Sequence, residues 1–187
     1  MAPLNGRRLI LRRIIMFWIC LFAYIMLCEA LYIFMDGSYR AGRFTTLPAP
    51  KWRWLYYLLS FTWGLPMNIV GGLTALVLLC FRKKPKWYGW NLCFELPVNF
   101  GLSLGIFFIA PISGSTHTKN HEHGHSIQNA YFGPFSIGAV NAPSAIRFWI
   151  REIQSRRGNK PNTLYDEIWF EGQATLSGTA LIDDLNR

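Results

Sequence analysis

Long runs of apolar residues fill the first 112 positions of the chain, and a more polar segment follows them. The run at residues 14–35 has about the 20 residues that a helix needs to cross the hydrocarbon core of a bilayer. A second run at residues 54–81 is also long enough, and Gly64-Leu65-Pro66 inside it predicts a kink. This pattern predicts an all-α integral membrane protein with two clear transmembrane helices.

A third apolar segment, residues 90–112, is interrupted by polar and helix-breaking residues that include Glu95 and Pro97. Irregular backbone at membrane depth is tolerated only where the surrounding protein satisfies its polar groups. We therefore expect one or two broken or re-entrant segments, here and at residues 135–150, where Pro143 interrupts the apolar pattern. Because an unpaired carboxylate in lipid is costly, Glu95 is either functional or marks the membrane interface.

Basic residues flank these runs and outnumber the acidic ones. The chain has 19 Lys and Arg against 10 Asp and Glu, which gives a net charge of +9. Arginines precede the first run, and residues 82–86 after the second run are also basic. The positive-inside rule then places the N-terminus and this loop in the cytoplasm, as expected for a protein of the bacterial cytoplasmic membrane. The partners that we expect are membrane lipids and not nucleic acid, because no soluble segment carries a basic stripe interleaved with aromatic residues.

The polar segment contains the sequence His121-Glu122-His123-Gly124-His125. On a helix, His121 and His125 lie one turn apart on the same face, so two imidazole nitrogens can bind one metal ion. Glu122 is then placed to accept a proton from a water molecule that zinc has acidified. The motif thus predicts a Zn²⁺ cofactor with Glu122 as the catalytic base.

The helix that carries this motif is expected to end before Gly133-Pro134 and to lie at the membrane boundary. We therefore divide the chain into a transmembrane region, residues 1–112, and a membrane-associated metal-site region, residues 113–187.

A catalytic zinc site normally has three protein ligands and an open position for water. Glu171 is the best third ligand, because it lies in a helical pattern expected from about residue 163 to residue 176 and needs a charge partner when buried. It could instead form an ion pair with Arg147 or Arg151. Three other carboxylates compete for the ligand role: Asp166, Glu167 and Asp183.

Three further residues are expected around the metal ligands: Gln128, His123 and Arg147. Gln128 follows His125 by about one turn, so it either lines the cleft or is exposed to solvent. Arg147 or His123 is the expected donor to the oxyanion of a reacting carbonyl.

The combination of His-Glu-x-Gly-His with a later Glu-x-x-Ala resembles the gluzincin-type membrane zinc peptidases, which include the heat-shock membrane proteases and the CAAX prenyl proteases. In that family the third ligand is the Glu of a Glu-x-x-Ala-Asp helix, which this resemblance assigns to Glu171. Here Thr175 stands where the family has the Asp, so the carboxylate that usually supports a metal ligand is missing from that position.

The chain more closely resembles a group of bacterial membrane proteins that share His-Glu-x-Gly-His-x-x-Gln, then Gly-Pro, then Pro-Ser, then Glu-x-x-Ala. The corresponding residues follow in the same order here: His121 to His125, Gln128, Gly133-Pro134, Pro143-Ser144 and Glu171 to Ala174. The resemblance covers most of residues 100–178 and implies a zinc-dependent peptidase.

The sequence therefore predicts a membrane-embedded zinc metallopeptidase that hydrolyses peptide bonds of membrane-anchored or juxtamembrane substrates. The alternative is a non-enzymatic membrane assembly or transport factor, or a pseudo-peptidase. In that case the His-rich segment, which also contains His117 and His123, would bind metal structurally. One tightly held zinc ion favours the peptidase, whereas several weakly held ions favour the His-rich segment.

Overall fold

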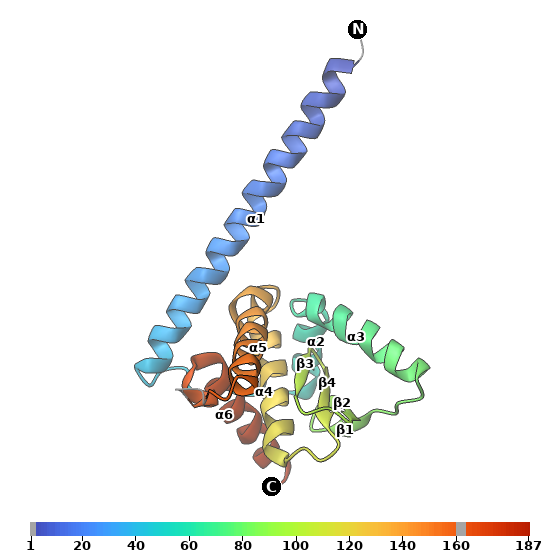
Figure 1. Ribbon diagram of the computed structural model, residues 1–187, viewed down its shortest axis with the longest axis vertical. Helices are drawn as coiled ribbons and strands as arrows, with labels where there is room; N and C mark the ends of the chain where they lie inside the picture. The colour runs from blue at the N-terminus through green and yellow to red at the C-terminus, as the bar shows by residue number, and fades with distance from the viewer. Residues whose placement is uncertain (1–2, 160–163) are drawn as a thin grey trace.

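The computed structural model describes residues 3–159 and 164–187. One long N-terminal helix extends away from a compact body formed by the other helices and a small sheet (Figure 1). The helices are α1 (Pro3–Arg40), α2 (Arg53–Phe61), α3 (Leu65–Cys80), α4 (Thr116–Phe132), α5 (Ala142–Arg156) and α6 (Trp169–Leu185). The strands are β1 (Lys86–Tyr88), β2 (Asn91–Leu96), β3 (Leu102–Leu104) and β4 (Phe107–Pro111). A π-helical turn (Ile137–Asn141) precedes α5, and a 3-10 turn (Tyr165–Glu167) precedes α6.

The segment predicted as the first transmembrane helix is helical and lies within α1. Within the described part of the chain, Arg8–Arg40 is the one continuous helix long and apolar enough to cross a membrane, and only 6% of its most apolar window is buried inside the protein. A core helix of similar composition would be mostly buried. The apolar side chains in the N-terminal half of α1 are therefore exposed, and Figure 1 shows this half extending away from the rest of the protein.

The second predicted span is not a single helix. The kink expected at Gly64-Leu65-Pro66 is a bend of 90° that divides this segment into α2 and α3. Each piece alone is shorter than the bilayer core, with 9 and 16 residues. A second span exists only if the bent pair is counted as one, so the prediction of two clear transmembrane helices is not confirmed.

The all-α prediction is wrong, because residues 86–111 form a four-stranded sheet with the order β1-β2-β4-β3. Strands β2 and β4 are parallel, and the other two pairs are antiparallel. The sheet lies between α3 and α4, so its central strands are covered on both faces. Phe94 and Ile109 face Ala75 of α3, whereas Cys93 and Phe108 belong to a separate buried cluster. Strands buried on both faces form continuous apolar runs, which is why this segment resembles a membrane span in sequence.

The other predicted broken segment, residues 135–150, is also regular. It forms the π-helical turn and the first half of α5, and Pro143 occupies the first turn of α5, where the missing N–H costs no helical hydrogen bond. Helix α4 ends before Gly133, as expected, and Gly133 has the positive φ of 56° that favours glycine.

Helices α4 and α6 pack closely because glycine backbones meet at two places. A Cβ atom at Gly124 would lie 1.8 Å from the Ala174 carbonyl oxygen, and one at Gly178 would lie 1.8 Å from the Asn120 carbonyl oxygen. Any side chain at either glycine would push the helices apart. Gly178 therefore lies inside α6, which runs from Trp169 to Leu185 and not over the predicted residues 163–176.

Glu95 has an electrostatic explanation. Its carboxylate accepts hydrogen bonds from the ammonium groups of Lys86 and Lys119, each at 2.6 Å. Hydrogen bonds from Lys119 and then from Lys86 lower the pKa of Glu95 from 4.5 to about 2. Glu95 lies in β2, so these ion pairs link β2 to the neighbouring strand β1 and to helix α4.

Replacing Glu95 by Gln should lower the free energy of unfolding by about 1 kcal/mol at neutral pH, because Lys86 is largely exposed and its share of the pairing is screened. A carboxyl whose pKa is lowered by folding stabilises the protein above its unfolded pKa. The difference between wild type and Glu95→Gln should therefore vanish between pH 4.5 and about 2. Thermal unfolding in detergent across this pH range measures it.

Glu152→Gln is the matched control, because Glu152 pairs only with the exposed Arg156 one turn away on α5. It should change stability by no more than a few tenths of a kcal/mol. A loss in Glu95→Gln that persists unchanged at pH 2 would show that the ion pairs are not its cause.

Candidate metal centre

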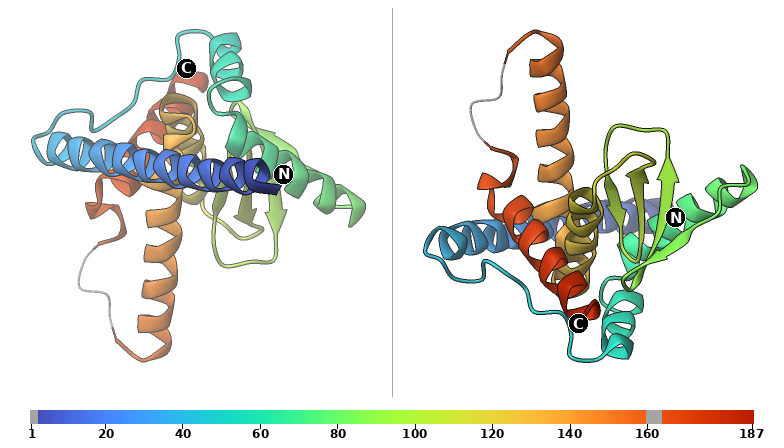
Figure 2. Two further views of the ribbon diagram at one scale, coloured as in Figure 1. Left: turned by 90° about the horizontal axis from the view of Figure 1, so that it is seen from above. Right: turned by 90° about the horizontal axis from the view of Figure 1, so that it is seen from below.

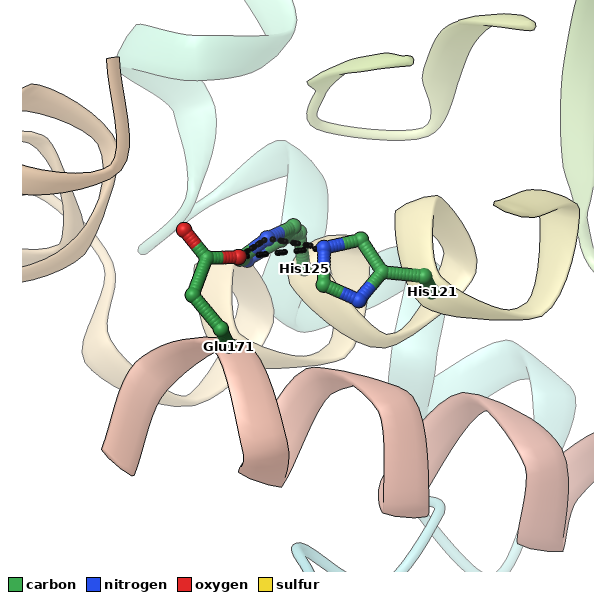
Figure 3. Close-up of side chains that lie close together, drawn as sticks. All are labelled: His121, His125 and Glu171. Atoms are coloured by element: carbon green, nitrogen blue, oxygen red, sulfur yellow. Dashed lines mark hydrogen bonds and ion pairs between the residues drawn. The ribbon is translucent and has the colours of Figure 1, made fainter. Parts of the chain in front are cut away.

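Three buried side chains from α4 and α6 meet at one point (Figure 3). The Nε2 atoms of His121 and His125 lie 3.1 Å apart. The Oε2 atom of Glu171 lies 3.1 Å from the first and 3.2 Å from the second. The structure thus brings together the three residues that the sequence analysis selected as ligands, and this cluster can bind a metal ion.

These distances match what a tetrahedral metal site needs. Zinc bonds of about 2.0–2.1 Å at tetrahedral angles place ligand atoms about 3.3–3.4 Å apart. The three observed separations are shorter by only a few tenths of an ångström. Two imidazoles and a carboxylate are also a ligand set found in catalytic zinc sites.

The orientation of His125 is fixed by Gln128. The His125 Nδ1 atom lies 2.8 Å from Gln128 Oε1, while Gln128 Nε2 donates to the Phe170 carbonyl and to Gln173 Oε1. Both hydrogens of the Gln128 amide nitrogen are used in these two bonds, so the Gln128 oxygen faces the imidazole. That oxygen can only accept, and His125 Nδ1 therefore carries the proton. The lone pair of Nε2 is then directed at the cluster.

A different chain of hydrogen bonds fixes His121. Its Nδ1 atom lies 2.8 Å from Thr175 Oγ1, and the Thr175 hydroxyl donates to Asp166 Oδ1 at 3.1 Å. The Thr175 oxygen therefore accepts the Nδ1 proton, and His121 Nε2 also presents its lone pair. Asp166 therefore lies outside the cluster of three and supports His121 through the Thr175 hydroxyl.

Glu171 is fully buried and is held by three partners. Ser144 Oγ donates to Oε1 at 2.7 Å, while Oε2 faces the two imidazoles. Burial alone would raise the pKa of Glu171, but hydrogen bonds from His121 and His125 hold it well below its usual range. Among the described residues, Glu171 forms ion pairs with these histidines and not with Arg147 or Arg151.

The cluster requires a positive charge. Burial would lower the pKa of His125, but the hydrogen bond to Glu171 and its negative charge outweigh burial and raise that pKa to about 9. Either a proton on an imidazole or a metal ion can supply this charge, so metal binding replaces a proton. The donor set therefore fits a divalent cation.

Glu122 lies beside the cluster and lines the same cleft. It is only 5% exposed, and no described side chain forms a hydrogen bond to its carboxylate. Burial raises the pKa of Glu122, although electrostatic interactions with His121 and His125 oppose that shift. Gly101 makes room for it, because a Cβ there would lie 2.1 Å from Glu122 Oε1.

The remaining histidines lie away from the cluster. His123 is buried on another side of α4, where its Nε2 accepts a hydrogen bond from the Trp90 N–H and burial lowers its pKa to about 4. It stacks on Tyr56 and supports the core. The His117 side chain is 62% exposed. Of the four histidines, only two converge with Glu171, so the His-rich segment does not form one metal-binding patch.

The expectation that Arg147 or His123 would stabilise an oxyanion is not supported by their positions. Arg147 Nη2 donates to the carbonyls of Leu164 and Tyr165, and its guanidinium lies 5.8 Å from the Tyr165 ring centroid. Arg147 therefore supports Tyr165, whose own ring lies 5.6 Å from that of His121.

The cleft beside the cluster has a volume of about 390 Å³. Its walls come from α3, β3, α4, α5 and the 3-10 turn before α6. Sequence reasoning missed Ser144 and Tyr165 as members of this site. The Pro143-Ser144 dipeptide was the available signal for Ser144, whereas nothing local distinguishes Tyr165 from an ordinary turn residue.

No protein-family model, no curated protein and no solved structure matches this chain. The site is therefore assessed from its geometry alone.

Removing the buried carboxylate should abolish metal binding. We expect purified wild type to hold close to one divalent metal ion per chain and Glu171→Ala to bind it more than about 100-fold more weakly, since loss of a supporting partner alone costs 10–100-fold. Metal content by atomic emission and competition with a chelator measure both. His117→Ala is the control and should bind like wild type; an equal loss there would favour the His-rich segment.

The hydroxyl of Thr175 should matter for metal affinity although it is not a ligand. Thr175→Val keeps the shape but breaks the hydrogen bonds to His121 and Asp166, and should weaken metal binding by about 10–100-fold. Thr175→Ser should restore affinity to within a few-fold of wild type. If Ser rescues no better than Val in the same chelator competition, the hydroxyl has no role in orienting His121.

Proposed function

We propose that this protein is a membrane-anchored zinc metallopeptidase related to the gluzincins that cleaves membrane-anchored or juxtamembrane peptides. The observation that carries the proposal is the convergence of His121, His125 and Glu171, together with Glu122, which lines one cleft with the two histidines. A structural zinc site is normally closed by four protein ligands, whereas three ligands leave a position open for water.

The residues of the cleft have distinct roles in this proposal. A zinc ion bound by His121, His125 and Glu171 would polarise the substrate carbonyl and lower the pKa of a water molecule toward neutrality. Glu122 accepts the proton of the attacking water and passes it to the leaving amine. Tyr165 keeps its phenolic proton, because burial and the charge of Glu171 raise its pKa, and donates a hydrogen bond to the carbonyl oxygen under attack.

The position of strand β3 is one reason to propose a peptide as the substrate. It is an edge strand of the sheet, and its residues Leu102 to Leu104 line the cleft together with His121 and Glu122. An extended peptide can add to such an edge through backbone hydrogen bonds, which brings its amide bonds past the cluster. Apolar side chains of Met67 and Phe148 in the same cleft favour apolar substrate residues.

We also propose that the N-terminus is cytoplasmic, in keeping with the arginines that directly precede the apolar stretch of α1. If α1 is the one spanning helix, its C-terminal end lies on the opposite side of the membrane and the body is attached on that side. Residues 82–86 follow the bent pair α2 and α3, so they share the side of the N-terminus only if that pair crosses the membrane as a second span.

Glu122→Gln should abolish hydrolysis while leaving about one metal ion per chain, because an amide keeps the shape but cannot accept the proton. The expected loss is at least about 10²–10⁴-fold in rate. The assay uses vesicles that contain the protein and a set of single-span reporter peptides with varied juxtamembrane sequences. Fragment masses show whether cleavage occurs on the side of the C-terminal end of α1.

Glu167→Gln is the matched control, because Glu167 is an exposed carboxylate outside the cleft. Full activity of Glu122→Gln would exclude it as the base. Cleavage of casein as fast as of any reporter would contradict the membrane-bound substrate class, and cleavage on the N-terminal side of α1 would contradict the proposed placement of the body.

A further inference from the structure

We propose that the outward faces of α3 and α5 form a second membrane contact, which holds the body partly sunk in the lipid beside α1 with the mouth of the cleft between the two helices. The occupant of this surface is the lipid bilayer. The proposal does not depend on metal binding or on catalysis.

The first argument comes from the free length of α1. Along the described part of α1, the first residue that forms a hydrogen bond to the body is Tyr24, whose hydroxyl donates to the Pro134 carbonyl at 2.8 Å and whose ring stacks on Phe135. Only 11 residues separate Tyr24 from Arg13, the last of the N-terminal arginines. At about 1.5 Å per residue, this stretch covers about 16 Å.

A hydrocarbon core is about 30 Å thick. The stretch of α1 between Arg13 and Tyr24 is therefore about 14 Å too short to cross it. Snorkelling of the Arg13 side chain toward the surface recovers only part of this difference. The rest of the hydrocarbon must surround the portion of α1 that already contacts the body. The body surface at the level of Tyr24 and Cys28 therefore lies in lipid.

Helix α3 provides one suitable surface there. Its sequence contains no charged residue, and its buried side packs on the sheet through Gly71 and Ala75. The opposite side exposes about half or more of each of several large apolar side chains: Ile69 (53%), Val70 (47%), Leu73 (60%), Leu76 (60%) and Val77 (55%). A helix that is apolar on every side is normally buried or in contact with lipid.

Helix α5 provides the other surface. None of its residues is buried, and its polar side carries Ser144, which reaches the metal centre, and Arg147. The other side of α5 exposes four apolar residues spaced by three or four positions, so that they lie on one face of the helix: Ile146 (60%), Trp149 (60%), Ile150 (50%) and Ile153 (49%). An amphipathic helix of this kind lies in the interface with its apolar face about 5–10 Å deep, and it includes the Trp that favours this depth.

Both helices have the orientation that this contact requires. Figure 1 shows α3 running across the direction of α1, and the two views of Figure 2 show α5 running across it as well. If α1 crosses the bilayer, α3 and α5 then lie along its surface. The bend of 90° between α2 and α3 sets this direction for α3.

Basic residues lie where lipid head groups are expected. Arg82, Lys83 and Lys84 follow the C-terminal end of α3, and Arg156 and Arg157 lie at the C-terminal end of α5; all five are exposed. Cations at the ends of interfacial helices are attracted to anionic head groups. This charge pattern favours a lipid surface over an apolar protein partner.

The cleft opens between these two helices. Met67 of α3 and Trp149 of α5 line it together with His121 and Glu122. A peptide bond close to the lipid surface can therefore reach the cluster from the side. That substrates use this route rests on the proposed function, whereas the membrane contact does not.

Spin labels on cysteines test the contact directly in full-length protein in lipid nanodiscs. Cys80 is exposed at the end of α3 and can be labelled in Cys20→Ser, because Cys28 and Cys93 are buried. For α5, Ile150→Cys is added to Cys20→Ser/Cys80→Ser. The collision rate with oxygen, which enters lipid, is compared with that of a water-soluble nickel chelate.

Two labels provide the references. Cys20 in Cys80→Ser reports lipid on α1, and Asp184→Cys in Cys20→Ser/Cys80→Ser reports water, because the Asp184 side chain is 69% exposed near the C-terminal end of α6. The oxygen-to-nickel ratio at Cys80 and at position 150 should exceed that at position 184 by several-fold and approach that at Cys20.

A ratio at both positions equal to that of Asp184→Cys would overturn the proposal, because the two helices would then face water. Shielding from both reagents would overturn it as well, since a protein partner or a second copy would cover the face. Neither outcome bears on hydrolysis, so the result is separable from the test of the proposed function.

Discussion

The contact between α4 and α6 is the constraint on which the site depends. Gly124 and Gly178 allow the two backbones to touch, and only at that distance can Glu171 reach the histidines of α4. The same contact takes the Glu171 carboxylate out of water, which costs several kcal/mol for an ionised group. A cation that offsets this cost, either a proton on an imidazole or a bound metal ion, would also stabilise the helix pair, so metal binding at this cluster would be linked to folding of this region.

The support of the cluster is distributed over several elements. Gln128 holds His125, Thr175 and Asp166 hold His121, and Ser144 holds Glu171. The Thr175–Asp166 pair shows how a carboxylate can support an imidazole through a hydroxyl. A hydroxyl between imidazole and carboxylate preserves the direction of the Nδ1 proton and lets the acidic residue come from the turn before α6. The absence of an Asp at position 175 therefore does not leave His121 without a supporting carboxylate.

Local signals predicted the parts of the structure that depend on local geometry. The spacing of His121 and His125 on one helix and the end of that helix at Gly133 follow from the chain itself. Glu171 was identified through its motif and through the need of a buried carboxylate for a partner. The sheet could not be recognised, because strands covered on both faces lose the alternation that distinguishes them from a membrane span.

Other errors arose where tertiary contacts decide. The last helix was expected to end at about residue 176, yet α6 continues through Gly178, where Asn120 of α4 leaves no room for a side chain. His123 was assigned to the surroundings of the metal from its place in the motif, but on the helix it points to Trp90 and the core. Only the packing of α4 between the sheet and α6 distinguishes these directions.

Helix α1, the candidate membrane span, also supports the cluster. Met35 of α1 packs with Trp169 and Phe170 at the start of α6, and the Tyr39 hydroxyl fills the space where a side chain at Gly172 would lie. These contacts border Glu171 directly in sequence, so the helix that is long and apolar enough to cross a membrane also fixes the element that carries Glu171. In the proposed membrane-anchored peptidase, this packing would set the depth of the cluster relative to the bilayer. A site held in this way would act on bonds within a narrow range of depth, which is a restriction on substrates that the cleft alone would not impose.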